Sequence, residues 1–152
     1  MTRSQIQVRR AMEKDGQDGI CTIRRSILEL CSEDHGNDER AIQAWMSNKT
    51  VEAWKAWLHS CRSKLLVGEI DGVLAGVGMI SGKGELLLLY VDPKYRLSGI
   101  SKSILFSLED TAKAWGCGSI FLESTRTAYR FYRDHGYAPD RSRGQLHLWK
   151  TL

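Results

Sequence analysis

The chain has 152 residues, of which 42% are hydrophobic and 26% charged, with 22 basic residues against 18 acidic ones. These values are typical of a globular domain and exclude a wholly disordered protein. The net charge of +4 is a mild basic bias that would suit a phosphorylated ligand, and no clustered basic stripe indicates a nucleic-acid partner. We expect a single domain over residues 1–152 whose core needs no disulfide or metal.

Neither a membrane segment nor a secretory leader is predicted. The longest apolar stretch, Leu86 to Val91, is far too short to cross a bilayer, and the charged N-terminus is not followed by a hydrophobic leader segment. We therefore expect a cytoplasmic protein without a membrane partner. The cysteines lack the spacing of a zinc site, and we interpret them as buried, reduced thiols: Cys21, Cys31, Cys61 and Cys117.

The first 60 residues predict one strand followed by helices. Residues 6–11 alternate apolar and charged side chains, as in a strand with one face in water. A helix is predicted from about Gly16, because isoleucines recur there at helical spacing. Residues 31–38 interrupt this helix, and helical character resumes over 39–46. Thr50 has the side chain and position of an N-cap for a further helix.

The middle of the chain predicts an antiparallel meander. Apolar strands over 64–70, 73–81 and 85–92 are separated by the turn sequences DG and GKG. The third strand does not alternate, so we expect it to be buried on both faces, with helices on both sides of the sheet. Gly76 and Gly78 do not match a dinucleotide-binding loop, because the third glycine is misplaced and a strand follows; close strand packing accounts for them.

The last third predicts helices and strands in alternation, which makes the chain an α/β protein. An amphipathic helix is expected over 99–115, a strand over 119–124, a helix over 125–135 and an alternating strand over 145–150. The apolar side chains of the final strand could form an interface or lie in the core, and we expect the core: Leu146, Leu148 and Trp149.

The segment from Arg96 to Ser101 joins a buried strand to a helix through glycine and serine. In this order, backbone N–H groups at the start of the helix can converge on an anion, helped by the helix dipole. Gly99 would let the backbone approach a phosphate closely, and Ser101 adds a hydroxyl donor. A capped helix with basic surface residues needs similar residue types, so the residues alone leave both interpretations open.

Two longer motifs resemble those of the GCN5-related N-acetyltransferase (GNAT) superfamily. LLLLYVDPKYRLSGISKSIL resembles its acetyl-CoA motif, an apolar strand ending in V-x-P and then R/Q-x-x-G-x-G/A before a helix; Ser101 replaces the usual Gly or Ala. FLESTRTAYRFYRDHGY resembles the later block N-x-x-A-x-x-F-Y-x-x-x-G-F/Y, with Thr125 where Asn is frequent. The order of elements extends the resemblance over nearly the whole chain, although the first 60 residues carry no sharp motif.

The resemblance implies a GNAT fold: a mixed, mostly antiparallel central sheet of 6–7 strands, helices on both faces, and a splayed parallel strand pair that binds acetyl-CoA. Acetyl-CoA would be the acetyl donor, with no metal. Backbone groups of the first splayed strand would bind pantetheine and polarise the thioester, and the following loop would hold the pyrophosphate. The residues implied in cofactor binding are Leu89, Tyr90, Val91, Arg96, Leu97, Ser98, Gly99, Ile100, Ser101, Lys102, Thr125, Ala128 and Phe131.

Tyr132 matches the residue that often acts as the general acid in this family, protonating the leaving sulfur. A half-buried aromatic that only packs beside the cofactor is the alternative. Glu85, Glu123 and His35 are candidates for the base, and no assignment is made; for Glu85 and His35 a solvated surface role is the favoured interpretation.

The acceptor site is expected between the first two helices, where Glu33, Asp34 and Trp45 could attract a cationic amine. Acids at a helix start and a tryptophan in the core are the alternative. The predicted activity is acetyl transfer to a primary amine, and the favoured hypothesis is that this amine belongs to a small molecule. A protein or peptide N-acetyltransferase and a non-catalytic acetyl-CoA-binding module are the alternatives, and the family resemblance allows a homodimer.

Overall fold

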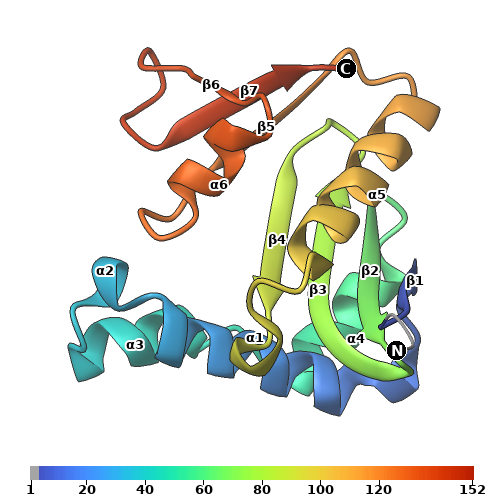
Figure 1. Cartoon of the computed structure of the whole chain (residues 1–152), viewed down its shortest axis with the longest axis vertical. Helices are drawn as coiled ribbons and strands as arrows, with labels where there is room; N and C mark the ends of the chain where they lie inside the picture. The colour runs from blue at the N-terminus through green and yellow to red at the C-terminus, as the bar shows by residue number, and fades with distance from the viewer. Residues whose placement is uncertain (1–3) are drawn as a thin grey trace.

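The structure, a computed structural model, describes residues 4–152, and Figure 1 shows its elements in chain order. The first half contains β1 (Ile6–Arg10), the 3-10 turn η1 (Glu13–Asp15), α1 (Gly16–Leu30), α2 (Ser32–His35), α3 (Glu39–Met46) and α4 (Val51–His59). The middle contains β2 (Ser63–Ile70), β3 (Val73–Ser81), β4 (Leu86–Val91), the 3-10 turn η2 (Pro93–Tyr95) and α5 (Ile100–Ala114). The last part contains β5 (Ser119–Glu123), α6 (Tyr129–Asp134), β6 (Ala138–Pro139) and β7 (His147–Thr151).

The strands form two antiparallel sheets that meet at one point. The first has the order β1-β2-β3-β4 and the second the order β5-β7-β6. An isolated parallel bridge between Glu85 and Phe121 joins them, and the Phe121 N–H donates to the carbonyl of Gly84 at 2.9 Å. Beyond this bridge β4 and β5 separate, as Figure 1 shows. The mixed, mostly antiparallel fold with a splayed strand pair is therefore confirmed, although the described strands form two sheets, of four and three strands, where one central sheet was expected.

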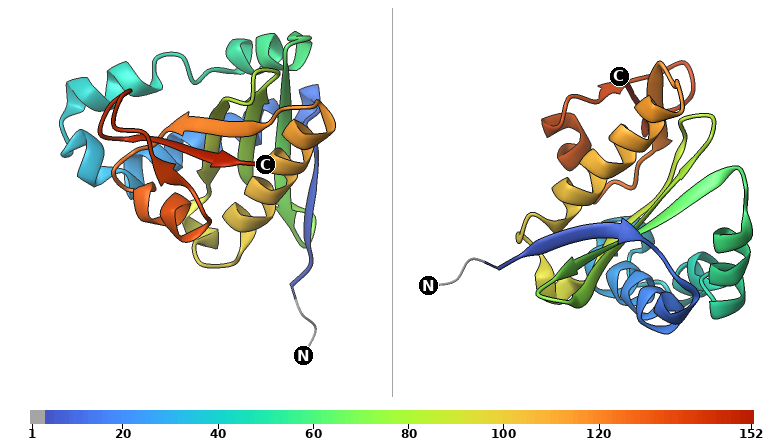
Figure 2. Two further views of the ribbon diagram at one scale, coloured as in Figure 1. Left: turned by 90° about the horizontal axis from the view of Figure 1, so that it is seen from above. Right: turned by 90° about the vertical axis from the view of Figure 1, so that its right-hand side faces the viewer.

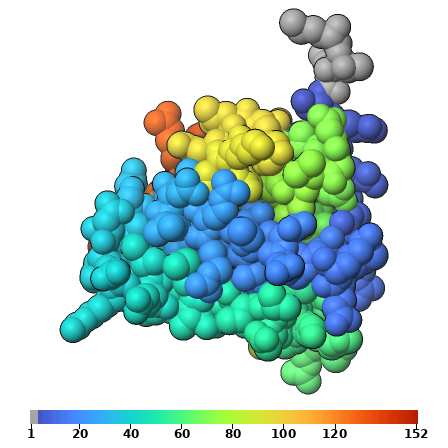
Figure 3. Space-filling view, turned by 90° about the horizontal axis from the view of Figure 1, so that it is seen from below, coloured from blue at the N-terminus to red at the C-terminus, as the bar shows by residue number. Residues whose placement is uncertain are grey.

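Helices cover both faces of the first sheet, as expected. In the right-hand view of Figure 2, α5 lies on one face of the strands and α1 and α4 lie on the other. Ile104 and Leu108 of α5 are fully buried on the first face, and Ile23 and Ile27 of α1 are fully buried on the second. Figure 3 shows the outer surface of the helices on the second face, most of which is formed by α1, α3 and α4.

Gly76 and Gly78 of β3 lie directly beneath α5. A Cβ atom at Gly78 would be 2.5 Å from Cγ2 of Ile104, and one at Gly76 would be 2.6 Å from Cδ1 of the same side chain. Only glycine lets the helix approach the strand this closely. The interpretation of these glycines as packing positions is confirmed.

A β-bulge interrupts β4 at Leu87. Leu88 is opposite Met79 of β3, whereas Leu86 is opposite Ile80, so that Leu87 has no partner in the register. The bulge puts Leu86 in the core under α5 and Leu88 in the core under α1, and leaves Leu87 40% exposed. The expectation that this strand is buried on both faces is therefore wrong at Leu87.

The helix expected over 125–135 begins only at Tyr129. The Thr125 hydroxyl accepts from the N–H of Ala128 at 3.1 Å, which closes a turn ahead of the helix. The expected cap at Thr50 is confirmed, because its hydroxyl accepts from the N–H of Ala53 at 3.1 Å.

Two expectations about burial are wrong in part. Cys31 is buried, but Cys21 and Cys61 are exposed on helix and turn surfaces and Cys117 is half-buried. In β7, Leu148 lies in the core, whereas Trp149 is 42% exposed, because alternate side chains of this strand face away from α5 and α6.

Candidate active site

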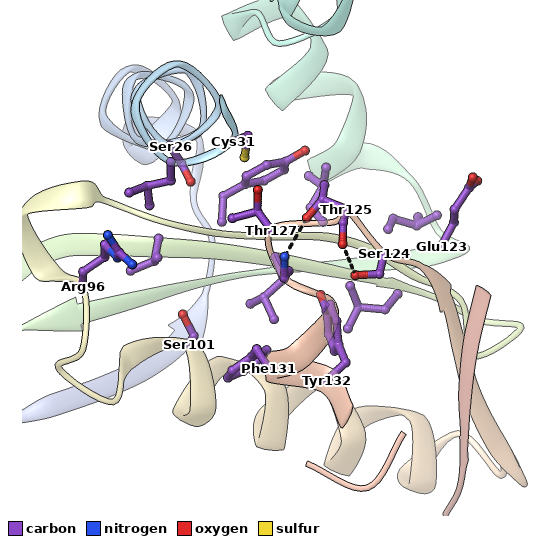
Figure 4. A pocket seen from close by; sticks show the side chains of 18 of the residues that line it. Ser26, Cys31, Arg96, Ser101, Glu123, Ser124, Thr125, Thr127, Phe131 and Tyr132 are labelled. Carbon is purple, nitrogen blue, oxygen red and sulfur yellow. Dashed lines mark hydrogen bonds between the residues drawn. The ribbon is translucent and has the colours of Figure 1, made fainter. Parts of the chain in front are cut away.

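A cavity of about 290 Å³ occupies the space where β4 and β5 separate. One wall is β4 from Leu86 to Val91, and the opposite wall is formed by the residues after β5 and by the first turn of α6. Ser26, Leu30 and Cys31, at the end of α1, close a third side. Figure 4 shows the lining, with Arg96 and Ser101 at one end and Glu123 at the other.

The loop before α5 presents a row of free backbone donors. Leu97 and Gly99 have positive φ angles of 61° and 91°, and Gly99 is the N-cap residue of α5. No acceptor among residues 4–152 takes the N–H groups of Leu97, Ser98, Gly99, Ser101 and Lys102, whereas the N–H of Ile100 donates to the Ser98 hydroxyl at 3.4 Å. Free N–H groups at the start of a 15-residue helix make an anion site suited to a pyrophosphate.

The structure brings most of the residues implied in cofactor binding to this cavity. Its lining includes Leu89, Tyr90, Val91, Arg96, Leu97, Ser101, Thr125, Ala128 and Phe131. Ser98, Gly99 and Lys102 lie in the loop and first helical turn at its edge. Ile100 differs from the rest, because its side chain is buried in the core beneath α5 and its N–H already has an acceptor.

Tyr132 lines the cavity from α6 and is only 4% exposed. Its ring packs edge-on to Phe131 and Tyr137, with centroid distances of 5.3 Å and 5.5 Å. Burial, with a smaller contribution from the nearby Tyr90 phenol, raises the pKa of Tyr132 well above its usual range. The phenol therefore stays protonated throughout the neutral range.

Tyr90 gives the cavity a second phenol, on β4. The indole N–H of Trp45 donates to the Tyr90 hydroxyl at 3.1 Å, and burial raises the pKa of Tyr90 to about 12. Trp45 does not itself line the cavity and contacts it through Tyr90. The family motif placed Tyr90 at the cofactor through its backbone, but nothing in the sequence indicated that its phenol is hydrogen-bonded to Trp45.

The acidic residues expected at the acceptor site lie outside the cavity lining. The carboxylate of Asp34, in α2, accepts from the N–H of Arg126 at 2.7 Å and from the Thr127 hydroxyl at 2.6 Å and N–H at 3.2 Å. Glu33 is exposed beside it. Asp34 thus connects α2 to the loop ahead of α6, and its charge is already engaged by donors.

The three candidate bases have different surroundings. His35 is buried, against expectation: its Nε2 is 2.8 Å from the carbonyl of Ile27, and its Nδ1 accepts from the N–H of Asn37 at 3.0 Å. Both ring nitrogens are engaged, so neither is free to accept a proton from a substrate. Glu85 is half-buried at the bridge between the sheets. Glu123 lines the cavity with a side chain that is 71% exposed.

Sequence reasoning missed the residues that α1 contributes. Ser26 and Leu30 are four positions apart and so share a face of the helix, but nothing in the sequence indicates that this face borders a cavity.

Cys31 lines the cavity beside this face of α1. Burial, together with the nearby Asp34 carboxylate, raises the pKa of the Cys31 thiol to about 11, which keeps it protonated and unreactive.

The described residues contain neither a group of metal-ligating side chains nor a helix that could span a membrane. Within 4–152, no three His, Cys, Asp or Glu side chains are grouped as ligands for a metal ion. In the same range, no helix combines the length and apolarity needed to cross a bilayer.

Comparison with known proteins gives the family. The sequence profile of the acetyltransferase (GNAT) domain matches residues 31–147, more than half of the chain. The chain therefore belongs to the GNAT acetyltransferase family. It is also similar to the amino-acid acetyltransferases of Pseudomonas putida (strain GB-1) and Pseudomonas syringae pv. syringae, each 39% identical over 59 residues. That segment is 39% of this chain but only 13% of either relative.

Solved structures share the whole fold. A GCN5-related N-acetyltransferase from Rhodopseudomonas palustris, described as an aminotransferase of class II, superposes with a TM-score of 0.86 at 22% identity, over 100% of this chain and 99% of that one. The PaiA N-acetyltransferase of Thermoplasma acidophilum, in complex with coenzyme A, has a TM-score of 0.84 at 21% identity, over 97% and 99% of the two chains. At these identities the likeness shows the fold.

Proposed function

We propose that this chain is an acetyl-CoA-dependent N-acetyltransferase that moves an acetyl group to a primary amine of a small molecule. The observation that carries the proposal is the cavity between β4 and β5, which combines free amides at one end with a buried phenol in its wall. The amides fit a pyrophosphate, and the length of the cavity leads from them past Tyr132 to Glu123, as Figure 4 shows.

Each part of the cavity would have one task. The free N–H groups of the loop, on either side of Ile100, would hold the pyrophosphate, with the Arg96 guanidinium beside them. The edge of β4 that β5 leaves open offers N–H and C=O groups to the pantetheine and to the thioester oxygen. Acetyl-CoA supplies a thioester whose carbonyl carbon is open to attack by an amine.

The proton balance gives Tyr132 its role. The amine nitrogen bonds to the acetyl carbon, the carbon–sulfur bond breaks, and the sulfur leaves with the bonding pair. An alkylamine has a pKa of about 10.4, so it must first lose a proton, which the exposed Glu123 carboxylate or water can take. Tyr132, which is protonated, donates the proton that the sulfur needs to leave as a thiol, and the proton that the attacking nitrogen loses on becoming an amide restores the phenol.

The tether between Asp34 and the Arg126–Thr127 loop supports a small acceptor. It joins α2 to the loop ahead of α6 and so leaves no wide groove between the early helices and the second sheet at this point. The similarity to amino-acid acetyltransferases supports the same choice, over the 59 residues it spans.

The test is thiol release from acetyl-CoA with a panel of amino acids, polyamines, aminoglycosides and peptides, together with calorimetric titration of coenzyme A. We expect coenzyme A to bind and at least one small amine to be acetylated. Peptide-only turnover would favour the protein acetyltransferase. Binding of coenzyme A without turnover of any amine would favour the non-catalytic module.

A further inference from the structure

A second hollow adjoins the Glu123 end of the cavity. We call it the basic hollow; it has a volume of about 300 Å³ and is lined by Glu123, Arg126, Arg143, Gly144, Gln145, Leu146 and His147. Glu123 lines both spaces, so the hollow and the cavity are neighbours at this residue. Figure 4 shows this residue at the end opposite Arg96. An acceptor that meets the acetyl group from the side away from coenzyme A would therefore come through the basic hollow.

Two guanidinium groups at the basic hollow are free to bind a ligand. Arg126 has its backbone held by Asp34, while its side chain has no hydrogen-bond or ion-pair partner within residues 4–152. Arg143 lies with its guanidinium carbon 5.7 Å from the centre of the Phe121 ring and forms an ion pair with Asp140 at 3.8 Å. Its side chain is 62% exposed and Arg126 is also exposed, so a ligand can reach both guanidinium groups.

The segment that carries Arg143 is held in place. The N–H of Asp140 donates to the carbonyl of His147 at 2.8 Å, and the N–H of Arg143 donates to the carbonyl of Asp140 at 3.1 Å. The acids facing this space are Glu123, whose carboxylate is 3.9 Å from Nε2 of His147, and Asp140 at its rim. Guanidinium groups on fixed backbones bind planar carboxylates in a bidentate manner.

We propose that the basic hollow binds the carboxylate of an acceptor that carries both an amine and a carboxylate. Arg126 and Arg143 hold the carboxylate, and the amine points along Glu123 into the cavity. This inference rests on the proposed function and names its substrate class. It keeps the expected cationic amine and adds a carboxylate to the acceptor. Asp34 has donors of its own and Glu33 is away from the cavity lining, so neither is given a part in binding that carboxylate.

The test compares L-amino acids with their decarboxylated amines and carboxamides, using Arg126→Gln, Arg143→Gln and the control Arg130→Gln. Arg130 is an exposed residue of α6 whose only ion-pair partner within the described chain is Asp134, one turn away. We expect each arginine variant of the hollow to raise the KM of the amino acid about tenfold, the loss of one charge-assisted pair. Turnover of the decarboxylated amine and the affinity for coenzyme A should stay unchanged, and Arg130→Gln should match the parent.

A binding measurement separates this inference from the proposed function. Amino acids and their decarboxylated amines are titrated calorimetrically into the protein saturated with coenzyme A, which requires no turnover. Tighter binding of the amino acid, lost in Arg126→Gln and Arg143→Gln, supports the basic hollow even if no acetylation occurs. Equal affinity for the two ligands, or an amino-acid affinity that both variants retain, overturns it.

Discussion

The Thr127 hydroxyl donates a hydrogen bond of 2.6 Å to the Asp34 carboxylate, across 93 positions of the chain. With the N–H groups of Arg126 and Thr127 on the same carboxylate, this contact fixes the distance between α2 and the loop that leads into Tyr132. Asp34, which we predicted at the acceptor site, thus holds two walls of the site together.

Removing the Asp34 carboxylate should therefore act through the fold. We expect Asp34→Ala to lower the free energy of unfolding by about 1–2 kcal/mol, because three donors lose their acceptor, and to weaken coenzyme A binding as the loop loosens. Urea unfolding and calorimetry measure both. Glu33→Ala is the matched control, since an exposed side chain should change stability by less than about 0.5 kcal/mol. Equal stability and equal coenzyme A affinity of the two variants would show that the Asp34 hydrogen bonds do not hold α2 to the loop.

Tyr132→Phe removes the phenol and keeps the ring. We expect kcat to fall at least about 100-fold, because general-acid catalysis contributes that much, with little change in coenzyme A affinity. Tyr129→Phe, one helical turn earlier and outside the cavity lining, is the control and should keep full turnover. Full activity of Tyr132→Phe would contradict the general-acid role and show that this ring only packs in the site.

Gly99 has a φ of +91°, and a β-branched residue there would force the loop to change. We expect Gly99→Val to weaken coenzyme A binding by about tenfold or more, because the displaced amides lose charge-assisted contacts to phosphate. Gly36→Val imposes similar strain at φ +60°, with open space around its Cβ and no part in the cavity lining. It should lower stability and leave affinity intact; an affinity loss shared by both variants would refute the loop assignment.

Asp15 should make stability depend on pH. The Arg9 guanidinium donates to both of its oxygens at 2.8 Å and holds the pKa of this carboxyl below its usual value of 3.8. A lowered folded-state pKa stabilises the protein above the unfolded-state pKa, and this contribution is lost as the pH falls through the folded-state value. Asp15→Asn should therefore be less stable than the parent at pH 7, and the gap should narrow by pH 3. A gap that is constant across this range in urea titrations would argue against the ion pair.

The contact between Gly78 and Ile104 leaves no space for a methyl group. We expect Gly78→Ala to cost about 1–3 kcal/mol of stability, as overpacking does. Gly82→Ala is the control, because the nearest atom to its Cβ, a carbonyl oxygen of Arg62, is at an ordinary 3.5 Å. Thermal unfolding of the two variants compares them; equal midpoints would show that α5 can move away from β3.

Hydrophobic period and turn residues predicted the helices and strands well, because those signals are local. The loop from Arg96 to Ser101 could be recognised for the same reason, because the glycine at position 99 itself indicates a backbone with positive φ. Contacts between distant segments could not be predicted in this way. Nothing near Asp34 indicates that its partners lie at Thr127, and nothing near Trp45 indicates Tyr90.

Burial of single residues was the second kind of failure. His35 was expected in solvent because it stands among polar residues, yet two backbone groups satisfy its ring nitrogens inside the protein. Trp149 was expected in the core because it is large and apolar, yet it falls on the outer face of β7. Residue type sets the average burial, whereas the face of an element decides the individual case.

The bulge at Leu87 has a bearing on how such a site can arise. A strand without the extra residue would keep one register along its whole length, and its edge could pair with β5 as any neighbouring strand does. One additional residue bends β4 away after the Glu85–Phe121 bridge and turns a sheet edge into the wall of a cavity. A change in length of a single residue thus separates a closed structural sheet from one with room for a cofactor.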